Sequence, residues 1–270
     1  MRPHYGGYTL IFISLKQDIM KHIFIMVLVC IALFGCNQRA IPSHTTITNT
    51  TIVNDDNKPI LAGHCSLAIL QNAPYADWYL KNYADYLVDT ITARQLHPFL
   101  QNKTMEIFLG SWCGDSKREV PKMLKILQVA GFDTSHLSLI FVDNSTAAYK
   151  QSPQNEELGK DIHHVPTFIM YDGKREMGRI VETPSVSFEK DLLAILNNED
   201  VPAKYKAIAW WQQEVNGKKK HLNETELKDL ATTLKLLCRN AGEFNAYGYV
   251  LLAQKNYKEA INVFKLNTFI

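Results

Sequence analysis

The order of apolar segments in the middle of the chain constrains its fold more than any other feature. An apolar run over 104–110 predicts a buried strand, and the pattern of 117–130 predicts a helix that Gly131 ends. A second apolar run over 137–142 predicts another buried strand. Strand, helix and strand in this order are typical of the first half of an α/β domain.

The segments that follow complete this domain. Runs over 166–171 and 176–181 flank Asp172-Gly173, a dipeptide typical of a tight hairpin turn, and 187–197 has the spacing of an amphipathic helix. The whole order predicts an α/β fold in which a small central mixed sheet has helices on both faces.

One cysteine stands where the first predicted strand gives way to the first predicted helix. Cys113 lies in the sequence SWCGDS at 111–116, so it is expected at or just before a helix amino terminus. Backbone N–H groups and the helix dipole stabilise a thiolate at such a position. The sequence therefore indicates thiol chemistry at Cys113.

The segment 104–198 resembles the thioredoxin superfamily in several motifs at once. Trp112-Cys113-Gly114 is similar to the family's active-site opening, Pro121 falls where its first helix kinks, and Val165-Pro166-Thr167 resembles its cis-proline loop. The sequence of 113–121, with a helical region before it, is most similar to that of envelope thioredoxin-like proteins of Bacteroidetes. The resemblance implies a thioredoxin fold over 102–200 and thiol–disulfide exchange that needs no cofactor.

The resemblance also implies roles for single residues. Cys113 is expected to be the nucleophile, Trp112 to shield it, and Pro166 to shape the substrate groove. The groove is expected to include four neighbours of these residues: Gly114, Asp115, Val165 and Thr167.

Ser116 is a departure from the family pattern, because it occupies the position of the second cysteine of CxxC. A serine hydroxyl cannot resolve a mixed disulfide, so dithiol reduction is not expected. Ile107 likewise replaces the buried acid that serves the second thiol in thioredoxins. What remains is monothiol exchange by Cys113, resolved by a substrate thiol or a small external thiol, with the Ser116 hydroxyl as a hydrogen-bond partner.

Charged residues and histidines near the motif in sequence are expected to influence the thiol. Asp115 disfavours a thiolate, whereas Lys117 and Arg118 favour it. His163-His164 just before Val165 are expected to be surface histidines near the sulfur. Even with His64 beside Cys65, their spacing matches no standard ligand set, so no metal site is predicted.

The remaining cysteines give two open questions. Cys65 is either a distant resolving thiol for Cys113 or an incidental free thiol, in a chain expected to reach an oxidising compartment. Cys238 lies within a leucine pattern and is expected to be a buried packing residue.

The amino-terminal region has the pattern of a bacterial export signal. Met20-Lys21-His22 precedes an uncharged apolar stretch over 23–35, and Leu33-Phe34-Gly35-Cys36 resembles a lipobox whose cysteine is lipidated. Residues 1–36 are therefore interpreted as signal and lipobox, with Met20 as the initiator and a membrane anchor at Cys36. A plain cleaved signal or an uncleaved anchor are the alternatives, and 37–66 is predicted to be a flexible tether.

Helical patterns flank the central domain on both sides. Aromatic and apolar residues at three- and four-residue steps over 73–101 predict two helices within a helical lead-in at 67–101. Their aromatic stripe is expected to pack in the core, and a binding surface is the alternative. The stretch 201–270 predicts a helical tail, in which 244–266 resembles one tetratricopeptide hairpin. Such a hairpin needs neighbours, so it either docks on the preceding helices or belongs to a longer repeat protein.

Composition limits the functional classes. The 270 residues carry 29 Lys and Arg against 27 Asp and Glu, without the clustered positive charge that a nucleic-acid surface needs. The Ser-His-Asp order of serine hydrolases, a glycine-rich phosphate loop and the HExxH motif are absent from the sequence.

Taken together, these features predict an envelope lipoprotein, facing the periplasm or the surface, that exchanges protein or small-molecule disulfides. The alternative is a non-catalytic scaffold that binds protein partners through its C-terminal helices.

Overall fold

The structure is a computed structural model that describes residues 48–215, 218 and 222–270. The predicted signal, the lipobox cysteine Cys36 and the start of the predicted tether lie outside the described residues. None of the helices in the described ranges is long and apolar enough to cross a membrane.

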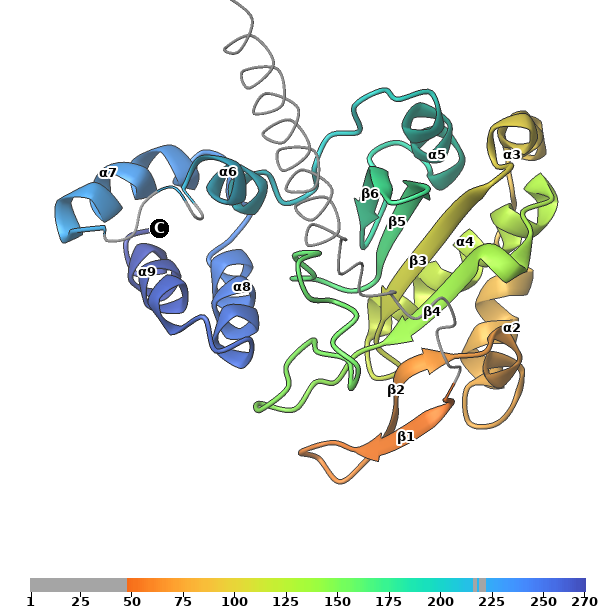
Figure 1. Ribbon diagram of the computed structural model, residues 1–270, viewed down its shortest axis with the longest axis horizontal. Helices are drawn as coiled ribbons and strands as arrows, with labels where there is room; N and C mark the ends of the chain where they lie inside the picture. The colour runs from red at the N-terminus through yellow and green to blue at the C-terminus, as the bar shows by residue number, and fades with distance from the viewer. Residues whose placement is uncertain (1–47, 216–217, 219–221) are drawn as a thin grey trace, which may run out of the picture. The chain divides into compact units, whose positions relative to one another are not determined.

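A six-stranded mixed sheet forms the centre of the described chain, in the order β1-β2-β4-β3-β5-β6 (Figure 1). The pair β3·β4 is parallel, and every other neighbouring pair is antiparallel. This mixed sheet, flanked by helices and followed by a helical tail, confirms the predicted class. The strands are β1 (Thr50–Val53), β2 (Pro59–Cys65), β3 (Lys103–Leu109), β4 (Leu137–Phe141), β5 (Thr167–Asp172) and β6 (Arg175–Val181).

The first two strands correct the prediction that 37–66 is a tether. β2 pairs with β4, Gly63 opposite Phe141, and β1 pairs with β2 as the outermost strand. The turn between them is closed by the Asn54 side chain, which accepts from the backbone N–H of Lys58 at 2.9 Å. Polar β-branched residues suit an exposed edge strand, so low apolar content did not exclude a strand here.

Four helices cover one face of the sheet and bury the largest core. They are α2 (Ala76–Asp85), α3 (Thr90–Leu96), α4 (Gly114–Ala130) and α5 (Phe188–Leu196), with short 3-10 turns η1 (Leu67–Gln71), η2 (His97–Phe99) and η3 (Thr134–His136). Tyr79 of the predicted aromatic stripe is buried in this core, as expected. Leu87 and Ile91 are 89% and 75% exposed, so the prediction is wrong for these two.

Helix α4 carries a proline inside it, and a neighbouring helix compensates for the lost hydrogen bond. Pro121 has no N–H to donate to the carbonyl of Lys117. The Asn82 side chain of α2 donates to that carbonyl instead, at 3.1 Å. Gly131 ends the helix with φ of 71°, in the left-handed region that favours glycine. The helix that begins beside Cys113 thus keeps its Lys117 carbonyl paired and ends at Gly131.

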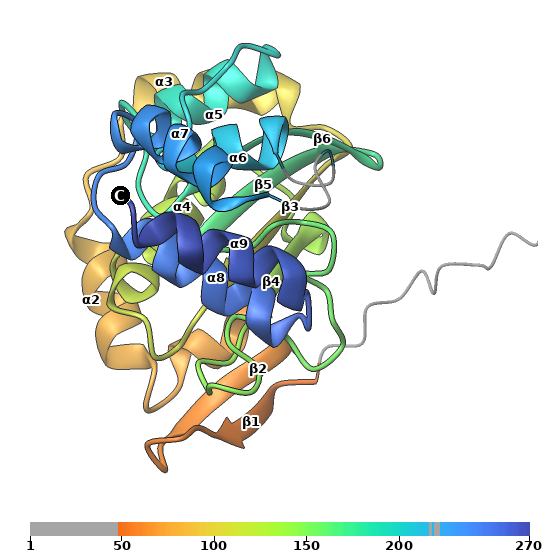
Figure 2. The ribbon, with the colours of Figure 1, turned by 90° about the vertical axis from the view of Figure 1, so that its left-hand side faces the viewer.

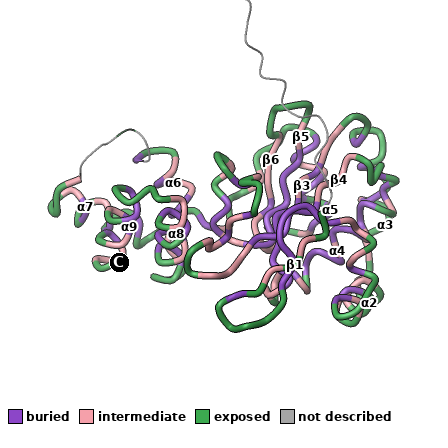
Figure 3. The backbone as a smooth tube through the Cα atoms, turned by 60° about the horizontal axis from the view of Figure 1, so that its bottom comes forward, coloured by how far each residue is buried: buried purple, intermediate pink, exposed green. Residues whose placement is uncertain are grey.

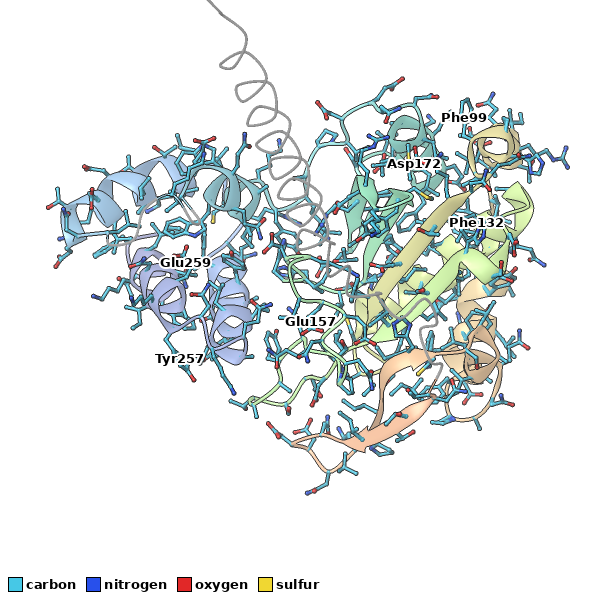
Figure 4. The ribbon with its side chains drawn as sticks, viewed as in Figure 1. Phe99, Phe132, Glu157, Asp172, Tyr257 and Glu259 are labelled. Carbon is cyan, nitrogen blue, oxygen red and sulfur yellow. The ribbon has the colours of Figure 1, made fainter. Side chains whose placement is uncertain are left out.

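The other face of the sheet is covered mainly by the segment between β4 and β5, which contains no helix, so the prediction of helices on both faces is wrong for this segment. A second apolar cluster on this face includes Phe108, Ile140 and Val165. Within the covering segment Glu157 is fully buried and accepts from the Ser152 hydroxyl at 2.6 Å (Figure 4). Figure 3 shows the buried strands running between these two covered faces.

Four helices form the tail and have a core of their own. They are α6 (Lys206–Glu214), α7 (Glu224–Lys235), α8 (Gly242–Ala253) and α9 (Tyr257–Asn267), with α8 and α9 side by side in Figures 1 and 2. Asn223 and Glu226 cap α7 reciprocally, as their spacing predicts. A Cβ at Gly248 would lie 2.5 Å from the Phe264 ring, so glycine permits the close approach of α8 and α9.

Candidate functional site

Cys113 lies at the point where β3 ends and α4 begins, as the sequence predicts. It is the N-cap residue of α4, is partly exposed, and its Sγ accepts from the backbone N–H of Ser116 at 3.5 Å. Its S–H donates to the carbonyl of Val165 at 3.3 Å. A sulfur at the N-terminus of a long helix faces the positive end of the helix dipole, which favours its anionic form.

The loop before β5 forms the second side of the site. The Val165–Pro166 peptide is cis, and both residues are buried. Thr167 closes the loop by donating from its hydroxyl to the His164 carbonyl at 2.7 Å, and the Pro166 carbonyl accepts from the N–H of Glu182 at 2.6 Å. The structure therefore places Val165 against Cys113, with Pro166 and Thr167 next to it in the same loop.

Ser116 contacts the sulfur through its backbone rather than through its side chain. Its side chain is fully buried, and its Oγ accepts from the N–H of Gly110 at 3.1 Å. The predicted hydroxyl-to-sulfur hydrogen bond is not among the contacts of the described residues. The hydroxyl instead joins the end of β3 to the first turn of α4.

The charged residues of the first turn of α4 neutralise one another. Arg118 forms ion pairs with Asp115 and, at 2.6 Å, with Glu119. Lys122 completes the network on Glu119 at 2.8 Å. Asp115 and Arg118, expected to act on the thiol in opposite directions, are paired with each other. Gly114 is exposed, with open space around its Cα.

The indole of Trp112 is held beside Cys113 by the end of β4. Its Nε1 donates to the Val142 carbonyl at 2.8 Å. Gly110 makes room for this arrangement, because a Cβ at that position would lie 2.5 Å from the indole Cε2. The position of Trp112 thus depends on a glycine that the sequence analysis did not single out.

Replacing Gly110 by alanine is therefore expected to displace the Trp112 indole. We expect a loss of about 1–3 kcal/mol in the free energy of unfolding, together with a changed tryptophan emission spectrum. Denaturant titration followed by fluorescence measures both. Gly114→Ala is the matched control, since a Cβ there meets nothing within 4 Å. Equal behaviour of the two variants would contradict the packing argument.

Two neighbouring histidines lie directly before the cis peptide. Their Nδ1 atoms are 2.7 Å apart, so one donates and the other accepts. Burial lowers the pKa of His164 to about 3, and burial also holds the pKa of His163 well below its usual value. His163 is only 7% exposed, so the prediction of surface histidines is wrong for it.

Aromatic residues of the tail pack against this histidine pair. Tyr205 stacks on His164 with ring centroids 3.9 Å apart, and Tyr247 meets His163 edge-on at 6.1 Å. Tyr249 makes a similar edge contact with Tyr149 at 6.3 Å. The tail therefore contributes to one wall of the site, which the linear sequence did not indicate.

Sequence reasoning missed Lys150, which the segment after β4 places against the loop that contacts the sulfur. Lys150 is buried, and its Nζ donates to the His163 carbonyl at 2.6 Å. Val165, two residues further along the same loop, accepts from the Cys113 S–H. No periodicity or motif marks this polar stretch, so the sequence held no signal for it.

The other two described cysteines stay apart from Cys113. Cys65 is buried in the core on the helix-covered face, while Cys113 packs against the cluster on the opposite face. Burial raises the pKa of the Cys65 thiol to about 11, which further disfavours a resolving role. Cys238 lies partly buried against the tail core, and burial likewise raises its pKa to about 11. All three are free thiols.

The described residues contain no group of three or more His, Cys, Asp or Glu arranged to hold a metal ion. Comparison with known proteins adds no functional assignment, because no family model, curated protein or solved structure matches the chain.

Proposed function

We propose that this protein is a member of the thioredoxin superfamily that exchanges disulfides through one active-site thiol. The observation that supports this most directly is the position of the Cys113 sulfur, 3.3 Å from the carbonyl of Val165 and at the N-cap of α4. The motif resemblance over 104–198 supports the same proposal. Ser116 in place of a second cysteine limits the chemistry to one thiol.

The proposed reaction is a pair of thiol exchanges with no net oxidation. The Cys113 thiolate attacks one sulfur of a substrate disulfide, the Cys113–substrate S–S bond forms, and the other substrate sulfur leaves with the electron pair as a thiolate. A second thiol, from the substrate or from a small external molecule, then attacks the mixed disulfide. This second step forms the new disulfide and releases the Cys113 thiolate.

The groups around Cys113 have distinct parts in this reaction. The N–H of Ser116 and the helix N-terminus stabilise the sulfur as an anion, both before attack and after release. Pro166 and Val165 present the loop against which a substrate disulfide is aligned. Trp112 covers one side of the sulfur and limits the access of water.

The proposal includes the setting of the activity. The sequence pattern of 1–36 supports an envelope lipoprotein anchored through Cys36, with protein or small-molecule thiols and disulfides as substrates. A cleaved signal and release into the periplasm is the alternative.

Replacing Cys113 by serine is expected to abolish exchange, because a hydroxyl does not attack a disulfide at neutral pH. Reduction or isomerisation of a scrambled disulfide substrate, with glutathione as the external thiol, measures the activity. Cys65→Ser and Cys238→Ser are the matched controls and are expected to keep it. Exchange that survives in the Cys113→Ser variant, with unchanged circular dichroism, would exclude the proposed nucleophile.

A second candidate function is a binding or scaffold protein, and the surface of the last two helices favours it. Four large apolar side chains on α8 and α9 are 38–55% exposed: Tyr249, Leu252, Tyr257 and Ile261. Exposed apolar groups on paired helices are typical of surfaces that take up a partner. An inert Cys113 in the exchange assay would support this second candidate.

A further inference from the structure

Lys150 is a buried cation for which the surrounding segment offers no carboxylate at bonding distance. Only 4% of the residue is exposed, and none of the ion pairs between described residues includes it. Its Nζ donates to the His163 carbonyl at 2.6 Å and lies 4.6 Å from the centroid of the Tyr149 ring. An ammonium group out of water is costly unless an anion accompanies it.

Backbone hydrogen bonds that link Asp143 to Lys150 and Gln151 fix the position of Lys150. The N–H of Lys150 donates to the Asp143 carbonyl at 2.9 Å, and the N–H of Asp143 donates to the Gln151 carbonyl at 2.8 Å. The residue has a φ of 57°, which a lysine adopts only where its surroundings require it. Asp143 directly follows Val142, the residue that accepts from Trp112. Lys150 is thus fixed to the same end of β4 that positions the site.

Five ionisable groups lie around Lys150, and one of them, Tyr149, keeps its proton near neutral pH because burial raises the pKa of its hydroxyl. Glu182 follows β6, but its carboxylate already accepts from Lys204 at 2.7 Å and from the Tyr205 hydroxyl. His163 and His164 are imidazoles that burial keeps uncharged near neutral pH. Cys113 is the fifth, and its S–H donates to the carbonyl of Val165, two residues along the loop from the His163 carbonyl that accepts from Lys150. Of these groups, only Cys113 can supply a negative charge that no other residue has taken.

We infer that the Lys150 ammonium is the counter-charge of the Cys113 thiolate and acts as a positioning residue for the exchange reaction. When the thiol ionises, the sulfur can no longer donate to the Val165 carbonyl, and a negative sulfur beside that oxygen is unfavourable. The fixed ammonium offsets this repulsion, and the thiolate in turn supplies the anion that the buried ammonium lacks. This inference rests on the proposed function and assigns it a residue from outside the sequence motif.

Replacing Lys150 by methionine tests this inference, because methionine keeps the length and apolar stem of the side chain but carries no charge. The rate of iodoacetamide alkylation of Cys113 is measured against pH, in a background where Cys65 and Cys238 are serine. We expect the pH midpoint of alkylation to rise by about one unit and alkylation at pH 7 to slow about fivefold to tenfold. Lys150→Arg is expected to recover most of the rate. Lys125→Met is the matched control, since Lys125 also donates to backbone carbonyls, those of Ala84 and Tyr86.

A reciprocal measurement keeps the inference testable even if the methionine variant folds poorly. The titration of Lys150 is followed by its side-chain carbon resonance in selectively labelled protein. In the Cys113→Ala variant its midpoint is expected to fall, because the partner anion is gone. An unchanged Lys150 titration together with an unchanged alkylation profile would overturn the inference.

The outcomes separate this inference from the proposed function. A shifted alkylation profile in a protein without exchange activity supports the counter-charge and contradicts the function. Full exchange activity with an unshifted profile supports the function and contradicts the counter-charge.

Discussion

Lowering the pH from 7 to 4 is expected to destabilise this protein through the histidine pair before the cis peptide. Burial lowers the pKa of His164 to about 3, and burial and the His164 neighbour also hold that of His163 well below its usual value. In the unfolded chain a histidine takes up a proton near its usual pKa of about 6.5. Between these values the unfolded chain binds more protons, so stability present above about pH 6.5 is lost as the pH falls.

The geometry of the pair explains the size of the effect. The two Nδ1 atoms share one proton at 2.7 Å, and a second proton would make both of them donors. Lys150, Lys204 and Arg239 add positive charge around His164 and oppose its protonation. We expect His164 to account for a loss of about 3 kcal/mol between pH 7 and pH 4, with His163 adding to it.

Urea denaturation at several pH values measures this loss. The double variant His163→Asn with His164→Asn should lose less stability on acidification than the wild type. His136→Asn, in a turn on another part of the chain, is the matched control. Parallel pH curves for the wild type and the double variant would contradict the prediction.

The second large effect is expected in the tail, from replacing Trp211 by alanine. The side chain is fully buried, its Nε1 donates to Glu259 at 2.6 Å, and its ring meets Phe244 edge-on at 6.0 Å (Figure 4 labels Glu259). Its removal leaves a cavity and a buried carboxylate without its donor. We expect a loss of about 3–5 kcal/mol in the free energy of unfolding.

Circular dichroism during chemical denaturation measures this change. Trp210→Ala is the matched control, because the neighbouring indole is only partly buried and packs at the margin of the same core. A similar loss in both variants would show that Trp211 has no special part in the tail. A loss confined to Trp211→Ala would identify it as the main core residue of these helices.

Elements with a strong periodic pattern and clear end signals could be predicted from the sequence. The strand before Cys113, the helix ended by Gly131 and the hairpin at Asp172-Gly173 lie within a few residues of their predicted bounds. The same patterns located Cys113 at a strand-to-helix junction. These features depend on interactions between residues that are near in sequence, which a pattern can record.

Other features arise only when distant segments meet. β1 and β2 are stabilised by pairing with β4, which a polar segment read alone does not indicate. Lys150 reaches the site through the backbone bonds of Asp143, and the tail tyrosines reach it through packing. Their chemistry depends on burial and on neighbours far along the chain, so the sequence pattern contains no sign of them.

The strand order has a consequence for how this chain folds. β2 lies early in the sequence, yet its partner in the middle of the sheet is β4, which is made much later. A lone two-stranded hairpin such as β1–β2 is at best marginally stable in water. During synthesis β2 can therefore pair with the sheet only after residues 137–141 have been made. The contacts of these first strands belong to the slow, long-range part of folding. A chain cut short before that point would expose an unpaired strand edge that invites aggregation.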